Sequence, residues 1–324
     1  MENILVIGGA GFCGINLAKF YLSGGYNVRI FDRMSRKYGK LNVEWLINNE
    51  NDLQVVKGDI THYDSLETHI VWADKIFHVA GQVASTTSIE NPRQDFMSNV
   101  MGTFNVLESV RNNNPSAVLL YMSTNKVYGR LENFDIHEFP PGVDESFPIN
   151  PTTPYGCSKC SAELYVRDYH RIYDLKTVVF RQSCIYGNRQ FGLLNQGWIS
   201  WIVYNLLSEN PITIYGDGNQ VRDILHVDDL VRVCDSVTSK ETSYGSVYNI
   251  GGGLDKCLSL NGLIDFLSIK DAKIQYDDAS SGDQKIYISD IRKAKKELDW
   301  TPIVSVEEGL GKFISWIDKY KYAF

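Results

Sequence analysis

Short apolar runs alternate with amphipathic stretches through the first half of the chain. The apolar runs are rich in β-branched residues and predict buried strands at residues 4–7, 27–31, 53–59, 75–80, 117–123 and 177–183. The stretches between them carry apolar residues at helical spacing and predict helices at 12–23, 63–70, 94–112 and 155–173. Buried strands that alternate with helices are typical of a parallel sheet covered on both faces. We therefore expect an α/β fold built on a parallel sheet.

The pattern loosens after residue 185. A short strand and turn are expected at 212–218, and a helix with an acidic first turn is expected from Val227. Residues 251–324 contain a short helix, an extended segment and an amphipathic end. We expect two interleaved domains. A core domain comprises residues 1–184 and about 219–250, and a smaller lobe comprises about 185–218 and 251–324.

Composition excludes several classes of function. The 324 residues are 44% hydrophobic, which is enough for a large core, and the net charge of −7 argues against nucleic acid as a partner. No apolar run approaches the ~20 residues of a membrane span, and the strand expected from Ile4 leaves no room for a signal peptide. The six cysteines, Cys157 and Cys160 included, lack the spacing of a disulfide framework or metal site. We expect a cytoplasmic protein without a bound metal.

A glycine-rich turn follows the first expected strand and precedes the first expected helix. Gly8, Gly11 and Gly14 form G-x-x-G-x-x-G, with Phe12 and Cys13 inside the turn. Glycines here allow the backbone to approach a pyrophosphate closely, with the helix N-terminus facing the phosphates. The context predicts a dinucleotide site rather than an incidental turn.

Asp32 stands at the end of the second expected strand. Its carboxylate is expected to bind the adenosine ribose hydroxyls and to repel a 2′-phosphate, which favours NAD over NADP. Arg33 would favour NADP if it faced the cofactor. We favour a solvent-facing Arg33.

Tyr155 and Lys159 form a Y-x-x-x-K pair on an expected helix, where positions four apart share one face. A phenol with the ordinary pKa near 10 is a poor base, and a neighbouring ammonium favours the phenolate. Tyr155 is then an acid/base for interconverting an alcohol and a ketone. The alternative is a surface pair of no chemical importance, which the nearby dinucleotide turn disfavours.

Taken together, these motifs resemble the extended short-chain dehydrogenase/reductase family of nucleotide-sugar enzymes. The similarity covers almost the whole chain, and its further motifs are Gly58-Asp59-Ile60, His78-Val-Ala80-Gly81-Gln82, Asn99, Met122-Ser-Thr124, Tyr186-Gly187, Val221-Arg222-Asp223 and Asp299-Trp-Thr-Pro302. The resemblance implies a Rossmann-type doubly wound parallel sheet with a smaller C-terminal substrate-binding lobe. It also implies bound NAD, a nucleotide-diphosphate sugar as substrate, and a homodimer or homotetramer.

The resemblance also implies roles for individual residues. Asp59 and Ile60 are expected to flank the adenine of the cofactor. The cofactor is also expected to be lined by Ala80, Gly81 and Gln82, with Asn99 near it. Thr124 occupies the position of the residue that hydrogen-bonds the reacting oxygen. Lys159 occupies the position of the residue that binds the nicotinamide ribose. For the sugar nucleotide we expect contacts from Gln82, Ser85, Thr124, Asn125, Lys126, Arg189, Gln196 and Arg222.

The residues after Thr124 bear on the reaction. In the 4,6-dehydratases of this family Asp-Glu follows the Thr, whereas here Asn125 and Lys126 follow it. The stretch Thr-Asn-Lys-Val-Tyr-Gly looks most like the subgroup of CDP-paratose 2-epimerases. The alternatives are a UDP-hexose 4-epimerase, a nucleotide-keto-sugar reductase and a non-catalytic NAD-binding module. One departure is Ser280, which stands near a position where related enzymes carry a diphosphate-binding Arg. Arg222 or Lys285 can supply that charge.

Overall fold

The computed structural model describes residues 1–50, 53–132, 134–137, 141–192, 197–269, 272–278 and 284–320. The chain divides into two compact units, each described here by itself. Unit 1 comprises Met1–Thr124, Pro154–Arg181 and Val231–Tyr248, and unit 2 comprises Asn125–Thr153, Gln182–Leu230 and Asn249–Phe324.

Unit 1 is built on a seven-stranded sheet with the order β10-β6-β5-β4-β1-β2-β3. The strands are β1 (Asn3–Ile7), β2 (Asn27–Asp32), β3 (Leu53–Lys57), β4 (Lys75–His78), β5 (Val118–Thr124), β6 (Thr177–Gln182) and β10 (Val247–Ile250). β1 pairs in parallel with β2 and β4, β2 with β3, and β4 with β5. The order reverses on either side of β1, which is the topology of a doubly wound fold. The expected fold class is therefore confirmed.

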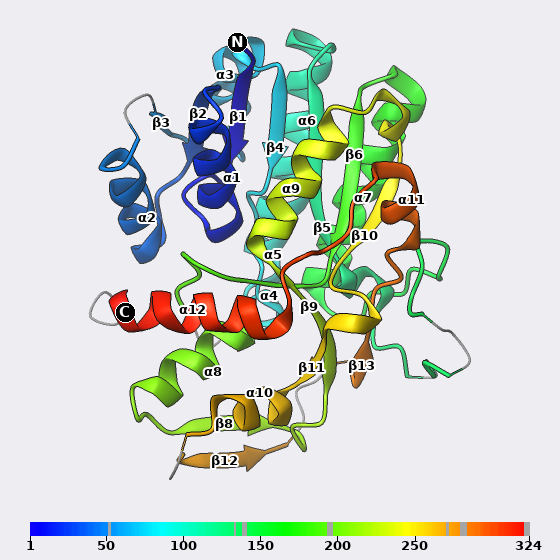
Figure 1. Ribbon diagram of the computed structural model, residues 1–324. Coiled ribbons are helices and arrows are strands. Elements are labelled where there is room, and N and C mark those ends of the chain that lie inside the picture. Colours follow the sequence, from blue (N-terminus) through cyan, green and yellow to red (C-terminus); the bar gives the residue numbers. More distant parts are fainter. Residues whose placement is uncertain are drawn as a thin grey trace. The chain divides into compact units, whose positions relative to one another are not determined.

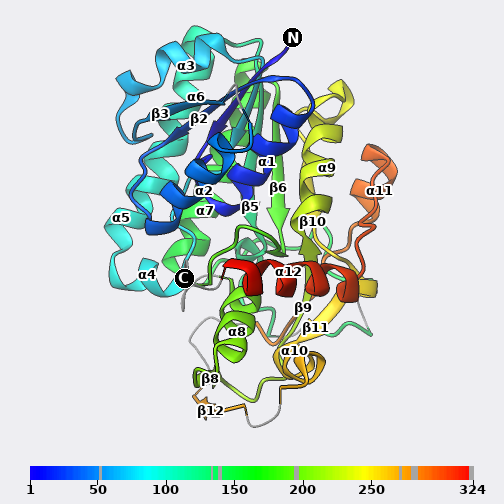
Figure 2. The same ribbon diagram turned by 60° about the vertical axis from the view of Figure 1, so that its left-hand side comes forward.

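Helices cover both faces of this sheet (Figures 1 and 2). They are α1 (Phe12–Ser23), α2 (Lys37–Ile47), α3 (Glu67–Trp72), α4 (Ser85–Glu90), α5 (Pro92–Phe96), α6 (Gly102–Asn113), α7 (Pro154–Tyr173) and α9 (Val227–Thr238). α3, α6 and α7 lie on one face, and α1 and α9 lie on the other, where the hydroxyl of Tyr21 donates to Asp235 at 3.2 Å. A buried hydrophobic cluster joins the sheet to α3, α6 and α7 through residues such as Ile7, Leu119, Val106 and Val166.

A π-helical turn at Met97–Met101 (η2) lies between α5 and α6. Short 3₁₀ turns occur at Tyr63–Ser65 (η1), Asn125–Tyr128 (η3), Glu241–Ser243 (η4) and Leu254–Lys256 (η5). π-Turns inside helices are rare and often mark functional positions. The helix expected over 94–112 thus exists, but this wider turn interrupts it.

Unit 2 contains smaller sheets. Its strands are β7 (Cys184–Tyr186), β8 (Ile212–Tyr215), β9 (Val221–His226), β11 (Cys257–Ser259), β12 (Ile274–Asp277) and β13 (Ile286–Tyr287). β9 pairs in parallel with β7 and β13 and antiparallel with β11, and β8 pairs in parallel with β12. The helices are α8 (Trp198–Leu207), α10 (Leu260–Leu267), α11 (Arg292–Leu298) and α12 (Val306–Tyr320).

All six strands expected in the first half of the chain are present, and so are the short strand at 212–215 and the helix from Val227. The expectations omitted several elements, among them α2, α4, α8, β7, β9 and β10. α2 buries only one narrow face, with Val43 and Leu46, in an otherwise polar stretch. β10 is only four residues long. Among the helices that the structure describes, none is both long and apolar enough to cross a membrane.

Candidate active site

The glycine turn joins β1 to α1 in unit 1. Gly8 has a φ of +87°, and a Cβ there would lie 2.5 Å from the Ala80 nitrogen. A Cβ on Gly14 would lie 2.5 Å from the Gly8 carbonyl oxygen. No side chain caps α1, whose N-cap is Gly11. The turn therefore keeps the first backbone N–H groups of α1 uncovered, as a bound phosphate requires.

Asp32 ends β2 beside this turn. One of its carboxylate oxygens accepts from the Ala10 N–H at 3.2 Å, and the other accepts from the Met34 N–H at 2.8 Å. These two bonds fix the carboxylate at the strand end. Arg33, the next residue, is exposed.

Two residues near the turn were not identified from the sequence. Asn42, buried on α2, donates to the Ala10 carbonyl at 3.2 Å. Arg36 donates to the Gly81 carbonyl at 3.3 Å and so joins the loop after β2 to the loop after β4. Asn42 could not have been found, because α2 itself was not expected.

Asp59 and Ile60 follow β3. The Asp59 carboxylate accepts from the N–H and the hydroxyl of Thr61, at 2.9 and 3.0 Å. Ile60 is buried, and its side chain lies so close to Gly102 that a Cβ on that glycine would meet it at 2.4 Å.

Asn99 on the π-turn holds the loop after β4. Its Oδ1 accepts from the Gln82 N–H at 2.9 Å, and its Nδ2 donates to the Gln82 carbonyl at 3.1 Å. A Cβ on Gly81 would lie 2.7 Å from the same Oδ1. The side-chain oxygen of Gln82 is buried and has no hydrogen-bond partner among the described residues, which is compatible with a role in binding a ligand.

Ser85 begins α4, and its carbonyl accepts from the Ser88 hydroxyl at 2.6 Å. The Ser88 oxygen in turn accepts from the Tyr155 N–H at 3.0 Å. The start of α4 is thereby tied to the start of α7.

Thr124, Tyr155 and Lys159 come together in unit 1. Thr124 ends β5 and its side chain hydrogen-bonds the Tyr155 side chain. Lys159, one turn further along α7, donates to the Met122 carbonyl, and its Nζ lies 4.3 Å from the centre of the Tyr121 ring. All three predicted catalytic residues are nearly buried, with exposed fractions of 7%, 9% and 6%.

Burial dominates the electrostatics of this group. It raises the pKa of Tyr155 to about 12, against the lowering effect of the Thr124 hydrogen bond. Burial also lowers the pKa of Lys159 to about 7, opposed by the charges of Asp95 and Glu163. Nearby His78 is fully buried, and burial followed by the Lys159 charge lowers its pKa to about 3. His78 is therefore neutral, and its Nε2 lies 3.0 Å from the Thr103 hydroxyl.

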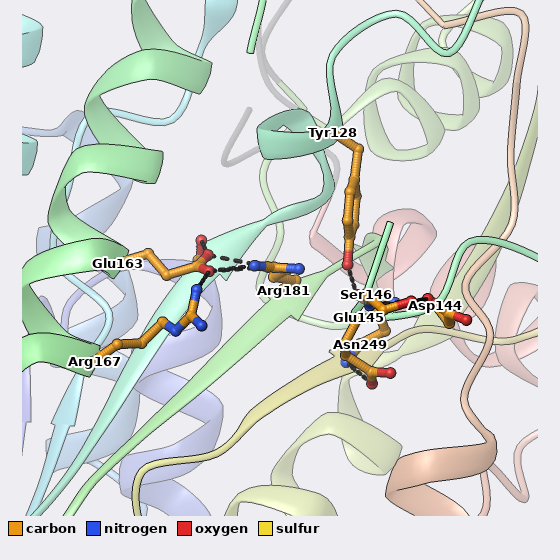
Figure 3. A network of polar contacts seen from close by, with 9 residues as sticks. Tyr128, Asp144, Glu145, Ser146, Glu163, Arg167, Arg181 and Asn249 are labelled. Carbon is orange, nitrogen blue, oxygen red and sulfur yellow. Dashed lines mark hydrogen bonds and ion pairs between the residues drawn. The ribbon is translucent and has the colours of Figure 1, made fainter. Parts of the chain in front are cut away.

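A buried ion pair lies close to the predicted catalytic residues in unit 1. Glu163 pairs with Arg181 at 2.6 Å, and both side chains are almost fully buried. Glu163 also accepts from the Ser123 hydroxyl at 2.8 Å. The half-exposed Arg167 lies 4.0 Å from the same carboxylate (Figure 3). Its position four residues after Lys159 places Glu163 on the same helix face, a signal present in the sequence.

The residues of unit 2 that we expect to bind the sugar nucleotide differ in their burial and in their hydrogen-bond partners. Asn125 is buried and donates from Nδ2 to the Gln284 side-chain oxygen at 3.4 Å. Gln284, fully buried, donates to the Gly129 carbonyl at 2.6 Å. Lys126 is half-buried. Burial raises the pKa of the nearby Cys184 thiol, and the positive charges of Arg222 and Lys126 oppose this effect.

The two arginines of this set are also largely buried. Arg222 donates to the Val221 carbonyl at 2.8 Å and to the Gln284 carbonyl. Arg189 has a φ of +74° and stacks over the Tyr320 ring, with 4.6 Å from the guanidinium carbon to the ring centre. Gln196 and Ser280 lie outside the described residues.

Unit 2 contains a polar network that the sequence did not predict. The Tyr128 hydroxyl donates to Asn249 Oδ1 at 2.7 Å, and the Asn249 N–H donates to Glu145 at 2.7 Å (Figure 3). Burial raises the pKa of the Glu145 carboxyl. The contacts join residues more than a hundred positions apart, which no local pattern indicates. In the part of the chain that the structure describes, no group of three or more His, Cys, Asp or Glu side chains is arranged to hold a metal ion.

A doubly wound sheet with a glycine turn, an acidic residue at the end of its second strand and a Thr–Tyr–Lys group is typical of a dinucleotide-dependent enzyme of the short-chain dehydrogenase/reductase type. The profile of the family described as GDP-mannose 4,6 dehydratase matches residues 5–313. The chain belongs to this family of extended short-chain dehydrogenase/reductases.

Similar proteins narrow the class further. A CDP-paratose 2-epimerase of Salmonella typhi is 40% identical over 97% of this chain and 98% of its own. A UDP-glucuronic acid 4-epimerase of Bacillus cereus, solved with UDP-glucuronic acid and NAD, has a TM-score of 0.87 at 27% identity, over 98% of this chain and 99% of that one. A dTDP-glucose 4,6-dehydratase of Bacillus anthracis, solved with NAD, has a TM-score of 0.85 at 31% identity, over 100% and 99% of the two chains. These relatives confirm the expected isomerase class and NAD as the cofactor.

Proposed function

We propose that this protein epimerises CDP-paratose to CDP-tyvelose at C2 of the sugar. The observation that carries the proposal is the pairing of an intact Thr124–Tyr155–Lys159 group with Asn125 and Lys126, where dehydratases of the family carry two acids. Without those acids, elimination of water lacks its usual acid/base pair. The 40% identity to a CDP-paratose 2-epimerase over nearly both whole chains supports the choice of substrate.

NAD fits the residues of unit 1. The glycine turn has no room for side chains at Gly8 and Gly14. We propose that the N–H groups of Phe12 and Cys13 bind the pyrophosphate, and that the fixed Asp32 carboxylate binds the adenosine ribose. The other cofactor contacts of this proposal are Asp59, Ile60, Ala80, Gly81, Gln82 and Asn99. Arg33 is exposed, as expected for a side chain that faces solvent.

Bound NAD would supply a reversible hydride acceptor for the sugar carbon, so that the reaction would have no net redox change. Tyr155, as the phenolate, accepts the proton of the sugar O2 and later gives it back. Thr124 donates to the same oxygen and orients Tyr155. Lys159 binds the nicotinamide ribose, and its charge favours the phenolate. Burial opposes this effect, because it raises the pKa of Tyr155 to about 12.

We propose that unit 2 holds the nucleotide while the 2-keto sugar turns over. Arg222 is the best candidate for the diphosphate, since a guanidinium can bind two oxygens at once. Its N–H groups already meet two backbone carbonyls, which fixes the direction of the guanidinium. The remaining sugar-nucleotide contacts in the proposal are Gln82, Ser85, Asn125, Lys126, Arg189 and Gln196.

We also propose a cytoplasmic homodimer or homotetramer. α7 carries apolar side chains that are about half exposed, at Leu164, Tyr165, Ile172 and Tyr173. Exposed apolar groups on one helix favour association with a second protein surface. Light scattering of the purified protein would measure the subunit number.

A UDP-hexose 4-epimerase is the second candidate. It is favoured by the overall similarity to the Bacillus cereus UDP-glucuronic acid 4-epimerase. It would use the same catalytic residues at C4 rather than C2. A nucleotide-keto-sugar reductase is a weaker alternative, and it would require added reduced cofactor.

The direct test incubates the purified protein with CDP-paratose, without added cofactor, and follows the sugar ring protons by NMR. We expect conversion to CDP-tyvelose until equilibrium is reached. Unchanged CDP-paratose together with conversion of a UDP-hexose would replace the proposal by the second candidate. Turnover only with added NADH or NADPH would indicate a reductase.

A further inference from the structure

Ser88 of α4 is a buried polar residue beside the predicted catalytic helix, and neither the motifs nor the proposed mechanism uses it. Its exposed fraction is 0%. Its hydroxyl donates to the Ser85 carbonyl oxygen at 2.6 Å and accepts from the Tyr155 N–H at 3.0 Å. A single oxygen atom therefore connects the start of α4, which carries a proposed sugar contact, to the backbone of the proposed acid/base.

The Tyr155 N–H needs a partner from outside its own helix. Tyr155 is the second residue of α7, which begins at Pro154. The first four N–H groups of an α-helix have no carbonyl partner within the helix. Because Tyr155 is almost fully buried, the partner has to come from the protein. The Ser88 hydroxyl thus does for α7 what a capping side chain does for other helices, although it belongs to a different helix.

The carbonyl group of Tyr155 is held as well. The Ser158 hydroxyl donates to it at 3.1 Å and accepts from Asn99 Nδ2 at 3.0 Å. Asn99 in turn bonds the N–H and the carbonyl of Gln82. The segment after β4 is therefore connected to the Tyr155 backbone at two points. Of these two connections, the one through Ser88 reaches Tyr155 without an intermediate residue of α7.

The position of the Tyr155 backbone matters because the phenol has to meet two groups at once. Its side chain hydrogen-bonds Thr124, and in the proposed mechanism both residues meet the same sugar oxygen. Proton transfer requires heavy-atom distances of about 2.6–3.2 Å. A displacement of ~1 Å at a reacting group can lower the rate by about 100-fold. A hydrogen bond that fixes the Tyr155 backbone therefore bears on turnover.

We infer that Ser88 is a positioning residue, which holds the Tyr155 backbone against the start of α4 and so fixes the phenol for the proposed reaction. The inference rests on the proposed function for its effect on turnover. The hydrogen bond itself belongs to unit 1 and can be measured without substrate.

The first test is amide hydrogen exchange at Tyr155, followed by NMR of protein labelled with ¹⁵N-tyrosine. The Tyr155 signal is the one missing from Tyr155→Phe. We expect this amide to be protected in wild type and to exchange at least ~10-fold faster in Ser88→Ala, which removes the accepting oxygen. Ser109→Ala is the matched control, because Ser109 is equally buried but accepts from Asn113 within α6, at 3.4 Å. Unchanged exchange in Ser88→Ala would overturn the inference.

The second test measures turnover of CDP-paratose by the NAD-loaded enzyme. We expect kcat of Ser88→Ala to fall by about 10–100-fold, with KM and NAD content close to wild type, because only the acid/base is displaced. Ser109→Ala should keep the wild-type kcat. A loss of NAD or of folded protein in proportion to the loss of kcat would indicate a merely structural role, contrary to the inference.

A second variant covers the case in which Ser88→Ala does not fold. Ser88→Cys fills the same space with a sulfur that accepts hydrogen bonds only weakly, so the same changes in exchange and kcat are expected. If wild type does not convert CDP-paratose, only the proposed function fails, and kcat is compared on a UDP-hexose instead. Faster exchange at Tyr155 with an unchanged kcat would show that the bond does not position the phenol, and would also overturn the inference.

Discussion

The hydroxyl of Ser123 donates a 2.8 Å hydrogen bond to Glu163. Ser123 directly precedes Thr124 on β5, and Glu163 lies one turn after Lys159 on α7. This contact ties the end of β5 to α7. Since Arg181 on β6 holds the same carboxylate, three elements meet at one buried charge. We infer that the relative placement of Thr124, Tyr155 and Lys159 depends on the Glu163 carboxylate.

Replacing Glu163 by Gln should therefore destabilise unit 1. The change leaves the Arg181 guanidinium buried without its carboxylate, a loss of about 3–5 kcal/mol in comparable cases. Urea unfolding followed by circular dichroism would measure it. The matched control is Arg167→Gln, which removes a half-exposed partner 4.0 Å from the same Glu163 and should cost less than ~1 kcal/mol. Equal losses in the two variants would show that burial of the pair is unimportant.

Replacing Tyr155 by Phe removes the proposed acid/base and little else. We expect kcat to fall by about 10²–10⁴-fold or more, with NAD content unchanged as measured by absorbance after denaturation. Tyr169→Phe is the control on the same helix. The Tyr169 hydroxyl donates to Glu108 at 2.7 Å and makes no other hydrogen bond among the described residues, so kcat should stay close to wild type. Substantial turnover by Tyr155→Phe would exclude Tyr155 as the acid/base.

Replacing Gly14 by Ala should prevent tight NAD binding. The new Cβ would lie 2.5 Å from the Gly8 carbonyl oxygen and 2.6 Å from the Gly9 Cα, both backbone atoms that cannot move aside cheaply. We expect purified Gly14→Ala to carry little NAD, as judged by enzymatic assay of the released cofactor. Gly311→Ala is the control, since a Cβ at this position would meet no atom within 4 Å. Alanine also has a higher helix propensity than glycine, so the change should be slightly stabilising. Full NAD content in Gly14→Ala would contradict the assigned pyrophosphate site.

His78 should make the protein less stable in acid. Its pKa is lowered to about 3 in the folded chain, against about 6.5 when unfolded. The stability it contributes is therefore fully present above pH 6.5 and is lost as the pH falls toward 3, by up to ~1.4 kcal/mol per pH unit. His78→Gln should flatten the decline in urea midpoint between pH 6.5 and 4.

The control for this prediction is His62→Asn, because His62 is exposed. Its acid stability profile should match that of wild type. An identical slope in His78→Gln and wild type would mean that His78 takes up its proton without a penalty, contrary to its burial.

The parts of the site that could be predicted from sequence are those that depend on neighbours along the chain. The glycine turn needs only Gly8, Gly11 and Gly14 between a strand and a helix, and Y-x-x-x-K needs only helical spacing. The parallel sheet with helices on both faces also follows, because apolar runs alternate with helices. The order of its strands does not.

The parts that could not be predicted depend on contacts between distant positions. Asn125 and Gln284 are 159 residues apart, and nothing near either residue marks it as a partner of the other. Arg181 lies in an apolar strand, where its charge is explained only by the Glu163 carboxylate across from it. The π-turn at Met97–Met101 has no signature in the apolar pattern, which continues through it.

That π-turn limits how the length of the chain can change. It accommodates one residue more than a regular helical turn would, so deletion of a single residue between Asp95 and Gly102 would restore regular winding. The helices on either side would keep their relative orientation, because the wide turn already absorbs the additional residue. Asn99, which lies on the turn, would be displaced from its hydrogen bonds with Gln82. We infer that this short stretch tolerates substitutions more readily than a change of length.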